Sequence, residues 1–198
     1  MLVLNDSAKS TYSTALRNSD LFRGSVRYVG HEIRAVILNM LHINTDDIIC
    51  IISGESIAVQ AAMAAGEGTI IAVEYDPNDQ RSMQENVDKF DLQNVEIVKD
   101  AKYDTLKDLP VPSLAFIVAT EKLDDEISNL LKINPEMEIV VYTLELNILS
   151  QIPGIFEKHH LRTLETMQIS VSKLNNKNVF EAQPAPWIIS SEPERDNA

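Results

Sequence analysis

The chain has 198 residues, 44% of them hydrophobic, and this length and apolar content suit one domain with a sizeable core. Its net charge of −13 argues against non-specific nucleic-acid binding, because such binding depends on cations that neutralise phosphates. No uninterrupted apolar run approaches the ~18 residues of a membrane span, and the first residues lack a charged head followed by an apolar stretch, so we expect a cytoplasmic protein that does not bind membranes.

Two details of the composition bear on ligands. Residues 1–34 hold five Lys and Arg against three Asp and Glu, so an anionic ligand would find its partners near the amino end. Cys50 is the only cysteine, which excludes an intrachain disulfide and a metal site of several thiolates. We expect Cys50 to be a buried apolar residue, and we predict no metal site.

In chain order, the first predicted elements are an arm and a helix. We divide the chain into an N-terminal arm at 1–29, one α/β domain at 30–190 and a solvated tail at 191–198. Residues 1–24 are polar and lack a sustained period, which is typical of an ordered arm or a frayed end. Gly30–His42 places its apolar residues on one broad face and predicts an amphipathic helix that precedes the first strand.

The stretch Asp47–Glu74 predicts a βαβ unit of nucleotide-binding type, with two apolar strands around a small-residue helix. The turn after the first strand, at Ser53-Gly54, is where a cofactor would sit. An acid about 20 residues beyond such a turn commonly binds ribose hydroxyls, and Glu74 stands in that place. The turn carries one glycine, although such turns usually carry two or three.

The rest of the chain alternates helices with apolar strands, which predicts a doubly wound, mostly parallel seven-stranded sheet with an antiparallel edge at its C-terminal end. Pro153-Gly154 must bend or interrupt its helix, and Asn175–Asn178 predicts a hairpin turn. The expected helices are Pro77–Phe90, Asp100–Asp108, Glu121–Lys132 and Glu145–His159, and the expected later strands are Asn94–Lys99, Ser113–Ala119, Met137–Leu144, Arg162–Lys173 and Val179–Ser190.

Two features near the C-terminus allow more than one interpretation, and a third bears on assembly. His159-His160 lies at the end of a predicted helix. We interpret it as a cation that the carboxyl end of the helix stabilises, and the alternative is a metal-binding pair. Trp187 is interpreted as a core or subunit-contact aromatic, and the alternative is a stacking platform for a ligand. The two long C-terminal segments carry more apolar surface than one sheet edge needs, which predicts a homo-oligomer.

Five segments, in this order and spacing, resemble a known family. The chain is similar to the small methyltransferase of corrin-ring (cobalamin) biosynthesis, which elsewhere forms the carboxy-terminal half of precorrin-6Y methyltransferase (decarboxylating). The resemblance spans about Asp20 to Ile189. The segments that carry it are Tyr28–Ala35 (YVGHEIRA), Ala72–Pro77 (AVEYDP), Asn94–Ala101 (NVEIVKDA), Thr143–Glu145 (TLE) and Phe180–Pro186 (FEAQPAP).

This resemblance implies a Rossmann-like class I methyltransferase fold, S-adenosylmethionine as cofactor, methylation of a corrin precursor with loss of an acetate side chain's carboxyl group, and a homotetramer. It implies that Glu74 holds the ribose hydroxyls, Asp100 the adenine amino group, and the Ser53–Ser56 turn the methionine part. It assigns no catalytic residue. The implied cofactor-binding residues are Ser53, Gly54, Glu55, Ser56, Glu74, Asp100 and Ala101, and the expected substrate-binding residues are Arg27, His31, Arg34, Thr143 and Glu145.

The turn departs from the family pattern, because its repeated glycines and opening acid are missing here. Glu55 is either a first-turn acid that the helix dipole stabilises or an occupant of the anion site itself. A cofactor carboxylate ~5–6 Å from it would be repelled by ~3 kcal/mol at an effective dielectric near 20. Two alternatives to the corrin methyltransferase therefore stay open. The first is a degenerate, non-catalytic binding or assembly subunit that has lost the cofactor. The second, which is less favoured, is a nicotinamide enzyme.

Overall fold

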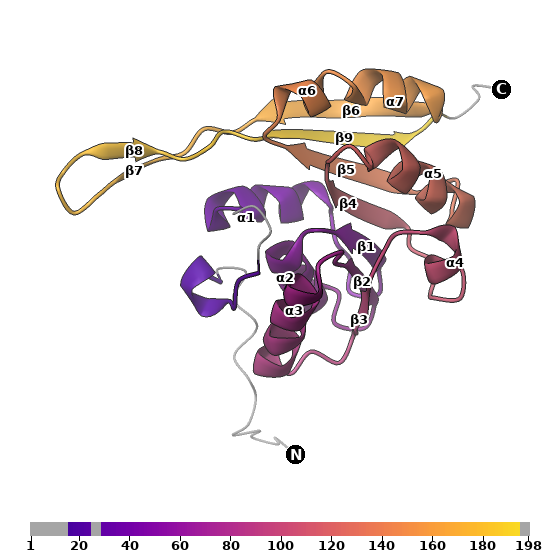
Figure 1. Ribbon diagram of the computed structural model, residues 1–198, viewed down its shortest axis with the longest axis horizontal. Helices are drawn as coiled ribbons and strands as arrows, with labels where there is room; N and C mark the ends of the chain where they lie inside the picture. Colours follow the sequence, from indigo (N-terminus) through magenta and orange to yellow (C-terminus); the bar gives the residue numbers. More distant parts are fainter. Residues whose placement is uncertain (1–15, 25–28, 195–198) are drawn as a thin grey trace, which may run out of the picture.

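The computed structural model describes residues 16–24 and 29–194 and has an α/β architecture (Figure 1). Its main sheet has seven strands in the order β3-β2-β1-β4-β5-β9-β6, of which the first five are parallel. The strands are β1 (Ile48–Ile52), β2 (Thr69–Val73), β3 (Val95–Val98), β4 (Leu114–Val118), β5 (Glu138–Thr143), β6 (Leu161–Gln168), β7 (Ser172–Leu174), β8 (Phe180–Ala182) and β9 (Trp187–Pro193).

Helices cover both faces of this sheet (Figure 1). The first three α-helices pack on one face, and the last four on the other. Among the described residues, no helix combines the length and the apolar character that a membrane crossing requires. The helices are the 3-10 helix η1 (Asn18–Asp20) and α1 (His31–Met40), α2 (Glu55–Ala64), α3 (Pro77–Phe90), α4 (Tyr103–Leu106), α5 (Leu123–Ile133), α6 (Leu146–Leu149) and α7 (Ile152–Lys158).

Strand β1 shows why the core has two halves. Its side chains alternate between the faces of the sheet, so Ile49 and Ile51 join the core under α1, α2 and α3, whereas Cys50 and Ile52 join the core under α4 to α7. All four residues are fully buried, as expected for a strand covered on both faces. The prediction of a buried, unpaired Cys50 is confirmed.

The antiparallel C-terminal edge is confirmed, with β9 antiparallel to both β5 and β6. The predicted hairpin at Asn175–Asn178 is present, but its strands β7 and β8 form a separate two-stranded sheet that extends away from the body (Figure 1). Strand β9 continues to Pro193, beyond the boundary at position 190.

Three predicted elements are subdivided in the structure. The expected helix Glu145–His159 is divided into α6 and α7, because the chain turns before Pro153, which occupies the first turn of α7. The two long C-terminal segments are divided into four strands, since the chain leaves the main sheet after Gln168 and rejoins it at Trp187. Trp187 is partly buried against the second half of the core, which agrees with the core interpretation.

Candidate functional site

The residues expected to bind the cofactor follow three neighbouring parallel strands, at the point where each strand ends. Ser53–Ser56 follows β1, Glu74 follows β2, and Asp100 follows β3. Strand order reverses between β1 and β4, and ligands of open α/β sheets bind at such a switch point. The fold therefore gathers these residues at the carboxyl ends of the parallel strands.

The turn after β1 keeps a tight backbone despite its missing glycines. Ser53 has a φ of 54°, in the left-handed region that favours glycine, and its N–H donates to the carbonyl of Val73 at 2.9 Å. A Cβ at Gly54 would lie 2.7 Å from Ile51 Cγ2 and 3.1 Å from Phe116 Cδ1. Gly54 is thus required by core packing, and the strain of the turn is concentrated at Ser53.

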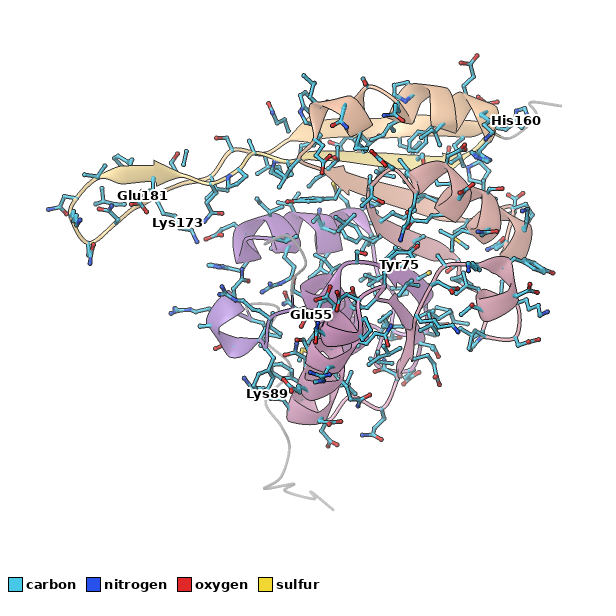
Figure 2. The ribbon with its side chains drawn as sticks, in the orientation of Figure 1. Glu55, Tyr75, Lys89, His160, Lys173 and Glu181 are labelled. Atoms are coloured by element: carbon cyan, nitrogen blue, oxygen red, sulfur yellow. The ribbon has the colours of Figure 1, made fainter. Side chains whose placement is uncertain are left out.

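Glu55 opens α2 and is almost buried, with 8% of its surface exposed (Figure 2). Its Oε2 accepts from the Gly24 backbone N–H at 3.1 Å, and its Oε1 accepts from Asn86 Nδ2 at 2.7 Å. Burial is the main reason why the pKa of Glu55 is raised to about 6, and the negative charge of Asp79 adds to this effect.

Glu74 is the most unusual acid of the site. It is 1% exposed, and neither carboxylate oxygen has a hydrogen-bond partner of normal geometry among the described residues. Burial, followed by the charges of Glu55 and Asp79, raises the pKa of Glu74 to about 8. An unpaired buried carboxyl is costly to a fold, so it is a strong candidate for a ligand contact.

Asp100 is engaged in local structure. Its Oδ1 accepts from Thr105 Oγ1 at 2.6 Å and from the Lys102 N–H at 3.2 Å, which fixes the start of α4. The hydrogen bond from Thr105 is the main reason why the pKa of Asp100 is lowered. Its neighbour Ala101 is buried in the second half of the core. These local hydrogen bonds of Asp100 compete with an adenine contact.

Residues 20–24 of the N-terminal arm cover the turn after β1, through contacts that sequence reasoning did not predict. Phe22 exchanges two hydrogen bonds with the Asn86 side chain, and Lys89 of α3 binds the carbonyl of Asp20 and lies over the Phe22 ring at 5.3 Å. Asn86 is fully buried, three positions after the core residue Met83. A polar residue on the apolar face of a predicted helix was the available signal for this contact.

The expected substrate-binding residues occupy different environments. Arg27 lies outside the described residues. His31 is partly exposed, and its Nε2 lies 3.0 Å from Glu32 Oε1. Arg34 is fully buried, and its guanidinium binds Gln60, the Asn18 side chain and the carbonyl of Leu16. We therefore leave Arg34 out of the proposed substrate contacts, because its donors anchor the arm to α1 and α2.

Thr143 is the last residue of β5 and Glu145 follows it, at the carboxyl end of a strand that β2, β1 and β4 separate from β3. Thr143 is 1% exposed, and its Oγ1 accepts from the Glu145 N–H at 3.0 Å. Thr143 thus shapes the turn after β5, and Glu145 is the more exposed of the two residues.

A second buried acid lies on the opposite face of the sheet. Glu126 Oε1 accepts from Tyr75 Oη at 2.6 Å, and Lys122 Nζ lies 3.5 Å from the Tyr75 ring centroid. His159 Nε2 lies 2.7 Å from Asp124 Oδ1, just after α7. Residues 16–24 and 29–194 contain no group of three or more His, Cys, Asp and Glu that could hold a metal ion.

Comparison with known proteins identifies related sequences and a related fold. The sequence model of a family described as "Precorrin methyltransferase domain" matches residues 20–182. A protein from Sulfolobus acidocaldarius, named probable cobalt-precorrin-6B C(15)-methyltransferase (decarboxylating), is 38% identical over 74 residues, which are 36% of this chain and 38% of that protein. A protein of the same name from Methanocaldococcus jannaschii is 29% identical over 174 residues, 85% of this chain and 92% of that protein.

Among solved structures, precorrin-6Y C5,15-methyltransferase from Geobacter metallireducens superposes with a TM-score of 0.83 at 23% identity, covering 91% of this chain and 97% of that one. At this level of identity, the similarity shows that the two chains share a fold.

Proposed function

Because this chain belongs to the precorrin methyltransferase family, whose sequence model matches residues 20–182, we propose that it methylates a ring carbon of a precorrin-type tetrapyrrole and removes the carboxyl group of an acetate side chain. The names of its relatives from S. acidocaldarius and M. jannaschii support the substrate class and the decarboxylation. Within the site, the observation that carries the proposal is the buried, unpartnered carboxyl of Glu74 after β2.

The residues present fit the nucleoside part of an S-adenosylmethionine cofactor. When ionised, the two oxygens of Glu74 can accept from both hydroxyls of a ribose, as an acid after the second strand of such a sheet commonly does. In this reaction class the cofactor's sulfonium supplies the methyl group. The protein must hold the nucleoside at the switch point, and we propose that Glu74 binds it there.

The residues do not fit the amino-acid part of that cofactor. The Glu55 carboxylate and the backbone of Gly24 occupy the space beside the turn. A second carboxylate placed there would be repelled by Glu55, and we derive no step through this part of the cofactor. This observation favours the second candidate function, a non-catalytic family member that has lost the cofactor.

On the substrate side, we propose that the basic residues near the amino end attract the carboxylates of the tetrapyrrole, because the rest of the chain is strongly acidic. Arg27→Ala should then weaken the binding of a polycarboxylate tetrapyrrole. The loss should shrink as salt rises, since exposed charges are screened within ~10 Å at 0.1 M ionic strength. Unchanged binding at low salt would remove Arg27 from the proposal.

We further propose a cytoplasmic homo-oligomer, with a second copy of the chain as the partner of the β7–β8 hairpin. The hairpin extends from the body and exposes Leu174, Val179 and Phe180, with 54%, 55% and 73% of their surfaces accessible (Figure 1). Exposed apolar side chains on a projecting hairpin are a favourable surface for association. A cytoplasmic location agrees with a single, buried thiol.

Conversion of a precorrin-6-type tetrapyrrole, with and without cobalt, tests the proposed function. The expected product, in the presence of S-adenosylmethionine, is heavier by one methylene group and lighter by one carbon dioxide in mass spectrometry. Glu74→Ala should abolish the conversion, whereas Glu165→Ala on the exposed face of β6 should not. If the M. jannaschii relative converts the same substrate and this chain does not, the non-catalytic alternative is the correct function.

A further inference from the structure

A small cavity lies between the arm and the turn after β1. Its volume is about 140 Å³, below the roughly 300–1,000 Å³ of ordinary ligand pockets. Ser53, Gly54, Glu55 and Ser56 line it from the turn, and the arm lines it through Leu21, Phe22, Arg23 and Gly24. The cavity lies beside the start of α2, and we refer to it below as the cleft.

The Glu55 carboxylate lies at the wall of this cavity, in a position where two donors converge and which we call the anion seat. The Gly24 backbone N–H and the Asn86 side-chain amide, donors from two other segments, both point to this carboxylate. Two hydrogen bonds and the N-terminus of α2 are the usual means of holding a carboxylate. The chain thus supplies the negative charge of this seat itself.

The surroundings of the seat are already rich in acids. Besides Glu55, the nearby Glu74 and Asp79 are 1% and 5% exposed. At neutral pH a ligand carboxylate that entered the cavity would meet the charge of Glu55 and the nearby acid Asp79, whereas Glu74, with its pKa raised to about 8, holds a proton. A ligand amine would meet complementary charge instead.

We propose that Glu55 makes this cleft selective for a nucleoside whose side chain ends in an amine without a carboxylate. The inference rests on the proposed function only in that Glu74 holds the nucleoside. Glu55 is a specificity-determining residue in this arrangement, because its side chain fills the seat that a ligand carboxylate would need. Once Glu55 has lost its charge, a ligand carboxylate bound beside it is no longer repelled.

Arg23 also lines the cavity. The competing hypothesis is that its guanidinium binds a ligand carboxylate. Its Nε donates to the carbonyl of Asn18 at 3.4 Å. If Arg23 received a ligand carboxylate, the cleft would prefer the ligand that carries one. The two explanations therefore predict opposite orders of affinity.

Calorimetric titration with two matched ligands separates these explanations. The ligands are S-adenosylhomocysteine and S-adenosyl-3-thiopropylamine, its decarboxylated form, which differ only in the carboxylate. Each is titrated into the unmodified chain and into Glu55→Gln, Arg23→Gln and Glu85→Gln. Glu85 is an exposed acid of α3 whose charge also reaches Glu55, so its variant controls for the loss of one nearby charge.

The unmodified chain and Glu85→Gln should bind the amine at least about tenfold more tightly than S-adenosylhomocysteine, which corresponds to ~1.4 kcal/mol. Glu55→Gln should bring the ratio of the two affinities close to one. The readout is a ratio within one protein, so a uniform loss of binding-competent protein cancels. Arg23→Gln should leave the preference for the amine in place.

Three results would overturn the proposal. The first is that the unmodified chain binds S-adenosylhomocysteine as tightly as the amine or more tightly, above all if Arg23→Gln removes this binding of S-adenosylhomocysteine. The second is an unchanged ratio in Glu55→Gln, and the third is no binding of either ligand by any variant. The proposed function can fail independently, because a chain that does not convert the tetrapyrrole can still show this ligand preference.

Discussion

Phe22 and Asn86, 64 positions apart, exchange two hydrogen bonds: the Phe22 N–H donates to Asn86 Oδ1 at 2.8 Å, and Asn86 Nδ2 donates to the Phe22 carbonyl at 2.9 Å. Asn86 Nδ2 also donates to Glu55 Oε1 at 2.7 Å. One buried side chain on α3 therefore fixes both the arm and the acid that closes the cleft. Stability of the arm and access to the cleft are linked through this residue.

Removal of the Asn86 side chain should release the arm. Asn86→Ala leaves the Phe22 backbone and the Glu55 carboxylate without these partners, and we expect a loss of about 1–3 kcal/mol in the free energy of unfolding. Urea denaturation measures this loss, and hydrogen exchange at residues 20–24 should become faster. Gln84→Ala, which removes an exposed hydrogen bond on the same helix, should change stability by less than about 0.5 kcal/mol. Equal effects of the two variants would show that the arm does not depend on Asn86.

The strained turn after β1 predicts that glycine has opposite effects on stability at Ser53 and at Ser56. Ser53→Gly should stabilise the protein, because relief of a left-handed backbone is worth about 1–2 kcal/mol and exceeds the entropic cost of glycine, about 0.5–1 kcal/mol. Ser56→Gly lies in the first turn of α2 and should destabilise it by a few tenths of a kcal/mol. Thermal unfolding of both variants checks the signs, and a loss of stability in Ser53→Gly would contradict the strain at this position.

Glu74 should make stability depend on pH. Its pKa rises from the ordinary 4.5 to about 8 on folding, so the folded state holds a proton that the unfolded state has lost within this range. Stability should then fall as pH rises from about 4.5 to 8, and stay constant for this group above that range. The advantage of Glu74→Gln in the free energy of unfolding should grow over the same range. An advantage that is independent of pH, or one shared by the exposed control Glu165→Gln, would rule out this origin.

The projecting hairpin gives a prediction about assembly. Phe180→Asp should weaken association, because it places a charge where the proposed second copy buries an aromatic ring. Light scattering should show a species larger than the 22.2 kDa chain for the unmodified protein and a shift toward the monomer for the variant. Leu146→Asp changes a 78% exposed residue on α6 and should leave the mass unchanged. A monomer at micromolar concentration in the unmodified protein would contradict the proposal.

The sequence by itself determined the order and type of the elements that precede the antiparallel edge. Apolar runs such as Ile48–Ile52 and the helical spacing of Met83, Val87 and Phe90 are local patterns, and local patterns decide which segments bury a face. The predicted bounds of α3, Pro77–Phe90, agree with the structure because a proline at the first helical position marks its start. The position of Glu74 at the end of β2 followed from the same reading.

Only the tertiary structure decided how the site is closed. The arm meets the site through Gly24 and Phe22, whose partners Glu55 and Asn86 lie 31 and 64 positions away in the chain. No periodicity connects residues at such separations, because these hydrogen bonds depend on how α2 and α3 pack side by side. For the same reason, the burial of Arg34 and the unpartnered state of Glu74 could not be read from the sequence: each depends on which polar groups of other elements come within reach.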